Sequence, residues 1–92
     1  MPGRGEERFA AAMALTLPGG EGETRNVSAS GVYFVTQVRL EAGSPLTFEV
    51  AFAAAAGGPL RMRCTGRVVR VEVLGREIGV GAAIDDFAVV RA

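Results

Sequence analysis

The sequence has no histidine, no lysine and no tryptophan, and its 92 residues include a single cysteine, Cys64. One cysteine cannot form an intrachain disulfide, and without histidine the chain has almost no ligands for a zinc or haem site. The commonest general bases and nucleophile pairs are missing for the same reason. We therefore expect a binding protein that is not an enzyme and holds no resident metal or cofactor.

Net charge is also absent, because ten arginines balance ten acidic residues. A neutral chain has no overall field that would attract nucleic acid or an anionic membrane, so any anion must be held locally. An all-arginine basic set suits bidentate contacts with phosphate and guanine, although a GC-rich coding bias, which the abundant alanine and glycine favour, also produces it.

Long hydrophobic runs are lacking as well, since none approaches the roughly 18–20 residues that cross a bilayer. The apolar segment Phe9–Leu17 follows Glu6 and Glu7 and precedes no small-residue cleavage pattern, which argues against a signal peptide. The expected location is cytoplasmic, without membrane insertion.

The length bounds the chain to one domain, and 13 glycines with 4 prolines predict many turns between short strands. Apolar alternation with period two predicts six strands. They lie at Phe9–Leu17, Thr24–Ser28, Val32–Val35, Leu46–Phe52, around Met62 to Val73, and at Ile78–Ile84. Their short connections favour an all-β fold, a small antiparallel barrel of six strands.

Two further patterns refine this barrel. In the fifth strand the apolar residues change from even to odd positions near Val68 and Val69, which predicts a β-bulge there. Asp85 and Asp86 resemble a helix N-cap, which predicts a short C-terminal helix. We expect one domain, residues 1–92, with an arginine arm (1–8), a barrel (9–84) and a short C-terminal helix or tail (85–92).

The fifth strand carries several arginines and the lone cysteine. Arg61, Arg63 and Arg67 have the parity opposite to the core, so a solvated barrel wall explains them better than an anion-binding face. Cys64 shares the core parity, which predicts a small buried residue rather than a redox sensor.

Arg4 and Arg8 form an R-x-x-x-R pattern before the first strand. They share a face in either a helix or an extended segment, so both guanidinium groups can reach one ligand. Such groups grip phosphate or a guanine edge bidentately. Taken alone, the pentapeptide that contains them is better described as a solvated, self-neutralising tail.

The second pattern is N-x-S-x-x-G, formed by Asn26, Ser28 and Gly31 at a corner between strands. Asn26 offers a donor and an acceptor, Ser28 a hydroxyl, and Gly31 a backbone that can adopt positive φ or approach a ligand. The competing interpretation is an ordinary Asx or ST turn.

Together, in this order and with 17 residues between them, and with the later G-R-V-V-R-V-E and I-G-V-G segments, the two patterns resemble the signature of the PilZ domain family. That family binds the bacterial second messenger cyclic diguanylate (cyclic di-GMP) on a barrel whose arginine segment folds over the ligand. The resemblance covers nearly the whole chain and implies a six-stranded barrel of PilZ type. It implies ligand contacts from Arg4, Arg8, Asn26, Ser28 and Gly31. Arg25, next to Asn26, can add an accessory phosphate contact, although a solvated arginine on the strand surface is the better interpretation.

Two features depart from the family pattern. Aspartate is commoner than asparagine at the position of Asn26, and an amide has one accepting oxygen where a carboxylate has two. Glu6 and Glu7 can pair with the arginines of the arm, but exposed pairs are worth only about 0.2–1 kcal/mol. Both changes predict weakened affinity.

The resemblance implies a receptor whose arm becomes ordered on binding and signals to a downstream protein. The alternative is a PilZ-type adaptor that no longer binds the nucleotide and uses an exposed apolar patch, with Tyr33, Phe34 or Phe87 as candidates. Zero net charge and few aromatic residues disfavour a nucleic acid partner. The expected oligomeric state is a monomer or weak homodimer.

Overall fold

The computed structural model describes residues 12–28, 30–54 and 58–91, and within these ranges it contains strands and no helix. The strands are β1 (Ala14–Leu17), β2 (Gly20–Val27), β3 (Gly31–Thr36), β4 (Pro45–Ala54), β5 (Gly58–Leu74) and β6 (Glu77–Arg91). Nothing in the described ranges is a helix long and apolar enough to cross a bilayer.

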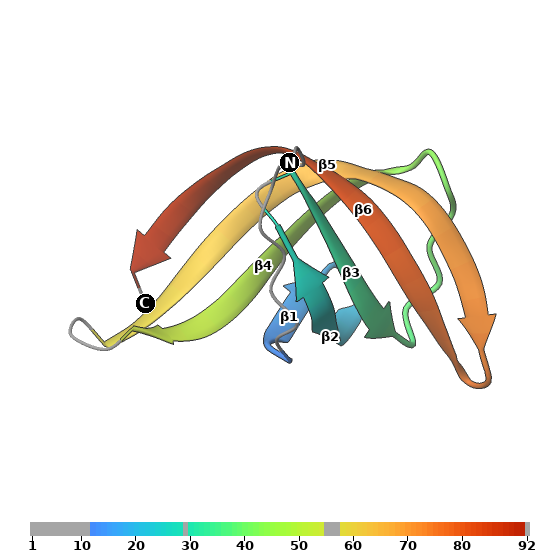
Figure 1. The fold of residues 1–92 in the computed structure, drawn as a ribbon, viewed down its shortest axis with the longest axis horizontal. Helices are drawn as coiled ribbons and strands as arrows, with labels where there is room; N and C mark the ends of the chain where they lie inside the picture. Colours follow the sequence, from blue (N-terminus) through green and yellow to red (C-terminus); the bar gives the residue numbers. More distant parts are fainter. Residues whose placement is uncertain (1–11, 29, 55–57, 92) are drawn as a thin grey trace, which may run out of the picture.

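The strands form a closed barrel in the order β1-β2-β3-β6-β5-β4, with every pair antiparallel. β5 and β6 arch across the whole molecule, and their ends project beyond the shorter strands (Figure 1). The barrel closes where β1 meets β4, through the pairs Leu15–Val50 and Thr16–Glu49. The predicted six-stranded antiparallel barrel is therefore confirmed.

The core follows from the alternation of side chains along the strands. Leu15, Phe34, Phe48 and Val80 are buried, and the two phenylalanine rings lie 6.1 Å apart between centroids. Cys64 is fully buried in the same cluster and forms no disulfide, as its parity predicts. Apolar residues that recur every second position thus fill the barrel interior.

The ladder between β5 and β6 contains two irregularities, one on each strand. The register shift between Val68 and Arg70 leaves out Val69 and confirms the bulge in β5 that the parity switch predicts. The second shift, where Thr65 pairs with Asp86 and Gly66 with Ile84, leaves out Asp85 of β6 and has no counterpart in the apolar pattern. Bulges increase local twist and bend a strand, so each of the two long strands can curl around the barrel.

The predicted C-terminal helix is wrong, because β6 continues as a strand to Arg91. Phe87 lies opposite Cys64 and Val89 opposite Met62 on β5. The Asp86 carboxylate accepts a hydrogen bond from the N–H of the next residue, Phe87, whereas a helix cap would accept from an N–H two or three residues on. A local capping signal competes here with a long neighbouring strand that offers a full ladder of hydrogen bonds, and the ladder prevails.

The first hairpin is tighter than the sequence suggests. β1 begins at Ala14 rather than Phe9, and residues 9–11 lie outside the described ranges. β2 begins at Gly20, because Leu17 pairs with Gly20 across a turn in which Gly19 has a φ of 95°. A positive φ suits glycine, so the predicted turn shortens to two residues.

Gly66 offers a test of the unforeseen bulge. A Cβ added there would overlap the backbone of Ala83 and lie 2.8 Å from its carbonyl carbon. Gly66→Ala should lower the free energy of unfolding by about 1–3 kcal/mol, the usual cost of overpacking, in a urea titration. Gly81→Ala is the matched control, since its Cβ would meet only the flexible side chain of Arg70 at 3.2 Å. Equal stability of both variants would contradict the tight approach at Gly66.

Candidate functional site

The structure describes one of the two sequence patterns, the corner between β2 and β3, but not the arginine pattern near the start of the chain. Arg4 and Arg8 lie outside the described residues, so their predicted role stays a prediction. The corner that contains Asn26, Ser28 and Gly31 is described, with a gap at residue 29. The site is therefore built from this corner outward.

Ser28 and Gly31 close the connection between β2 and β3. The Ser28 N–H donates to the Gly31 carbonyl oxygen at 2.8 Å, and its hydroxyl reaches the same oxygen at 3.3 Å. Ser28 is buried, and both bonds donate to a carbonyl oxygen, whereas in an ST turn the hydroxyl accepts from an N–H two residues further on. Its hydroxyl holds the corner in shape and keeps lone pairs that can still accept a hydrogen bond.

Gly31 is needed for space rather than for an unusual backbone angle. The glycines with positive φ among the described residues are Gly19, Gly43 and Gly75. At Gly31 a Cβ would lie 3.3 Å from the carbonyl oxygen of Ala82 on β6. The glycine therefore lets β3 approach β6 closely. Of the two reasons that the sequence offers for a glycine here, close approach is supported and a positive φ is not.

Asn26 lies on β2, half-buried, directly opposite Tyr33 on β3. The register of β2 shifts between Thr24 and Asn26, so Arg25 occupies a bulge. Arg25 is exposed and forms an ion pair with Glu23. Such an exposed pair is worth at most about 1 kcal/mol, so it leaves the Arg25 guanidinium accessible to an anion.

Asn26 begins a row of paired residues that crosses four strands. Tyr33 on β3 pairs with Gly81 on β6, and Gly81 pairs with Arg70 on β5. Directly opposed residues in a sheet share a face. Because Tyr33 lies between the buried Val32 and Phe34, this row belongs to the outer face of the barrel.

Tyr33 and Arg70 meet over the glycines of β6. The Arg70 guanidinium carbon lies 5.7 Å from the centre of the Tyr33 ring, and the Tyr33 hydroxyl donates to Glu72. A Cβ at Gly79 would overlap the Tyr33 hydroxyl, and one at Gly81 would crowd Arg70. The I-G-V-G segment thus directs Ile78 and Val80 inward and leaves an outer strip without side chains.

A hollow of about 380 Å³ lies on this strip beside the corner. Its lining residues are Gly31, Val32, Tyr33, Val69, Arg70, Gly81, Ala82 and Ala83. Another hollow, of about 430 Å³, contains Glu21 and Glu77, whose charge disfavours an anionic ligand. The hollow beside the corner is the better anion site, because Arg70 forms part of its wall.

Residues that sequence reasoning missed therefore lie at the centre of the site. The sequence suggests Tyr33 only for an apolar patch and Gly81 only as part of the I-G-V-G segment, and it gives Arg70 no site role. A usable signal did exist, since glycines at alternate positions of a strand imply that something lies close above one face.

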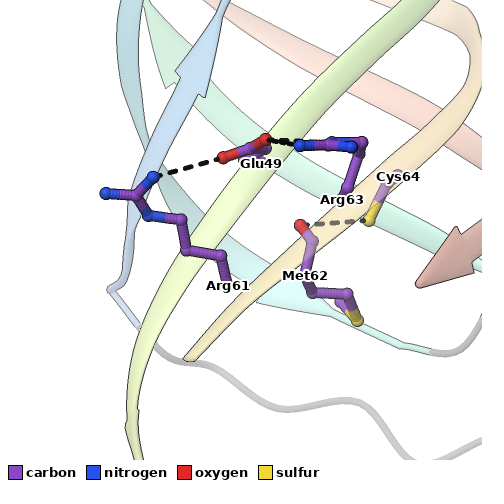
Figure 2. A network of polar contacts seen from close by, with 5 residues as sticks. All are labelled: Glu49, Arg61, Met62, Arg63 and Cys64. Carbon is purple, nitrogen blue, oxygen red and sulfur yellow. Dashed lines mark hydrogen bonds and ion pairs between the residues drawn. The ribbon is translucent and has the colours of Figure 1, made fainter. Parts of the chain in front are cut away.

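The other late-strand arginines have the predicted role of a solvated wall. Glu49 on β4 lies between Arg61 and Arg63, with nitrogen to oxygen distances of 3.8 and 3.0 Å (Figure 2). Arg67 pairs with Asp85 at 3.5 Å. These arginines are exposed and face acidic partners.

Cys64 lies on the same strand but faces the interior. Its sulfur is 3.9 Å from the Met62 carbonyl oxygen (Figure 2), and burial raises the pKa of the thiol to about 11. At neutral pH the group stays a thiol, which is unreactive toward oxidants. The core assignment of Cys64 is therefore confirmed.

The fold defines the chain as a small closed barrel of antiparallel strands. A family model described as "PilZ domain" matches residues 4–89, and the chain therefore belongs to the PilZ domain family, whose members are binding and adaptor domains. Comparison with curated proteins gave no match.

Among solved structures, the Bacillus subtilis inhibitor of motility (MotI/DgrA) has a similar fold, with a TM-score of 0.78 and 16% sequence identity. The match covers 96% of this chain and 45% of that one, so this chain spans about half the length of the matched protein. At this level of identity the likeness extends to the fold alone.

The pKa of Tyr33 gives a direct test of the outer row. The hydrogen bond to Glu72 raises this pKa above its ordinary value of 10.0, desolvation and the Glu72 charge act in the same direction, and Arg70 and Arg25 oppose the rise. Glu72→Gln should return the pKa of Tyr33 toward 10.0. Glu77→Gln is the matched control and should leave this pKa unchanged, because Glu77 is not among the groups that shift it.

Tyr33 is the only tyrosine and tryptophan is absent, so tyrosinate absorbance during a pH titration reports this residue alone. Because the folded pKa is raised, its contribution to stability is present below pH 10 and declines as the pH rises through the folded pKa. An unchanged pKa in Glu72→Gln would contradict the Tyr33–Glu72 hydrogen bond.

Proposed function

We propose that this domain binds cyclic di-GMP at the corner of Asn26, Ser28 and Gly31 and in the adjoining hollow. The observation that carries the proposal is the position of Gly31, which ends the motif and also lines the hollow. Motif and hollow therefore form one continuous surface on the outside of the barrel. Membership of the PilZ family supports the identity of the ligand.

The chemistry of the hollow suits a guanine dinucleotide. The Arg70 guanidinium lies within cation–π distance of the Tyr33 ring, and either planar group can stack on a purine base. The Arg70 guanidinium can also donate to a phosphate or to a guanine edge. Asn26 begins the same row and offers both a donor and an acceptor to a base.

The arginine arm can reach this surface from its point of attachment. The Met13 N–H donates to the Thr24 hydroxyl at 2.9 Å, and the Thr24 N–H donates to the Met13 carbonyl at 2.9 Å. These bonds fix the chain beside β2, two residues from Asn26, a separation of about 7 Å along a strand. Arg8 precedes Met13 by five residues, a reach of up to about 18 Å.

In this proposal the domain acts as a cytoplasmic receptor rather than as an enzyme. The ligand orders the arm against the barrel, and the new surface recruits a downstream protein. Ordering a segment costs free energy, and that cost links ligand occupancy to shape.

Arg8 is the sharpest test of the arm. Arg8→Ala should weaken cyclic di-GMP binding by about 10-fold to 100-fold, the effect of losing hydrogen bonds from a charged group worth about 1.5–3 kcal/mol. Arg39→Ala is the control, because Arg39 is exposed beyond the opposite end of β3. Isothermal titration calorimetry on the purified chain measures both. Unchanged affinity in Arg8→Ala, or no binding by the native chain, would contradict the proposal.

Asn26 provides a test in the opposite direction. Asn26→Asp should tighten binding by about fivefold, since a carboxylate accepts two donors of the guanine edge and charged hydrogen bonds exceed neutral ones by about 1 kcal/mol. The same calorimetry measures the change, and thermal unfolding of the ligand-free variant controls for altered stability. Weaker binding by Asn26→Asp would place the guanine edge elsewhere.

A second candidate function is the adaptor that does not bind the nucleotide. Val69, Val73 and Leu74 are exposed large apolar residues near the hairpin of β5 and β6, and this observation favours a protein partner. Phe34 and Phe87 are both predicted as candidates for an exposed apolar patch. The prediction for Phe34 is wrong because this residue is fully buried, whereas Phe87 is half exposed. Partner binding that ignores cyclic di-GMP would distinguish the adaptor from the receptor.

A further inference from the structure

The last part of β6 is the edge of a sheet in the described structure. β3 pairs with β6 only as far as Ala83, and the Ile84 N–H still donates to the Ser30 carbonyl. From Asp86 to Arg91 the strand pairs with β5 on one side, and no described strand lies along the other (Figure 1). A free edge presents backbone donors and acceptors to another strand.

This edge carries apolar side chains that the single chain leaves in solvent. Phe87 is 50% exposed and Val89 is 58% exposed. They lie opposite Cys64 and Met62, so they share the inward face and continue the core surface beyond the barrel. Burial of these two side chains would stabilise any strand that paired here.

The sequence of the edge is self-complementary. The acidic residues Asp85 and Asp86 lie at its start, and the basic residue Arg91 ends it. An antiparallel copy therefore sets the acidic start of one strand against the basic end of the other. We propose that a second copy of this chain pairs with β6 in this way, on a two-fold axis that passes through Ala88.

The register follows from the axis. Ala88 lies opposite Ala88 of the second copy, and Phe87 lies opposite its Val89, so four apolar side chains meet on one face. One edge donor is already occupied, because the Phe87 N–H bonds to the Asp86 side chain at 3.0 Å. Pairing exchanges this local bond for a strand-to-strand bond, and the short contact makes the dimer weak and concentration-dependent.

Sedimentation equilibrium of the full chain over a range of concentrations tests the dimer. The average mass should rise from the monomer value toward twice that value, and Val89→Lys should abolish the rise. Val73→Lys is the matched control, because Val73 is 75% exposed and lies at the other end of β5. A native chain that stays monomeric, or equal loss in both variants, would overturn the proposal.

Ala88 tests the axis itself. Like charges directly opposite each other destabilise a strand pair, so Ala88→Lys and Ala88→Glu should each weaken self-association by up to about fivefold. An equimolar mixture of the two variants should associate more tightly than either alone. Ala88 is exposed, and circular dichroism of each variant verifies the fold. If the mixture gains nothing over the separate variants, the two-fold pairing at Ala88 is wrong.

Discussion

The pairing of β5 with β6 is the constraint on which the rest of this barrel depends. It extends from Leu60 opposite Arg91 to Leu74 opposite Glu77, and one further strand pairs along each of its two sides. β4 pairs along β5, and β3 pairs along β6. The two bulges in this ladder turn what would be a flat ribbon into the curved wall of a barrel.

The same ladder determines the character of the outer surface at the candidate site. From Ile78 to Gly81, β6 alternates large inward side chains with outward glycines. The inner face of this stretch is therefore packed, and its outer face carries no side chains. Tyr33 from β3 and Arg70 from β5 close over this bare strip from opposite sides. A binding surface thus arises from side chains of flanking strands and from the lack of side chains on the strand between them.

Much of the fold could be predicted from the sequence because strand alternation is a local signal. The inward parity of Leu46, Phe48 and Val50, and the bulge near Val68, are legible in single residues. The bulge at Asp85, across from Thr65 and Gly66, and the extended path of residues 85–91 depend on a partner strand, which no local pattern reveals. The C-terminal helix was predicted wrongly for this reason.

The candidate site likewise has one part that a local sequence pattern reveals and one part that depends on strand pairing. The corner of Asn26, Ser28 and Gly31 is contiguous in sequence and could be recognised there. Tyr33 and Arg70 are 37 residues apart in the chain and become neighbours only through the register of β3, β6 and β5. Their association is a property of the folded sheet rather than of any motif.

The closure of the barrel has a dynamic consequence. Within the part of the chain that the structure describes, β1 holds four residues and pairs with β4 at two positions, whereas the β5–β6 ladder is several times longer. Local opening takes the route with the fewest contacts, so the amide hydrogens of β1 are expected to exchange with solvent before those of the long strands. The arginine segment precedes this strand in the sequence. A ligand that holds the arm against the barrel is therefore expected to slow the opening of β1 as well.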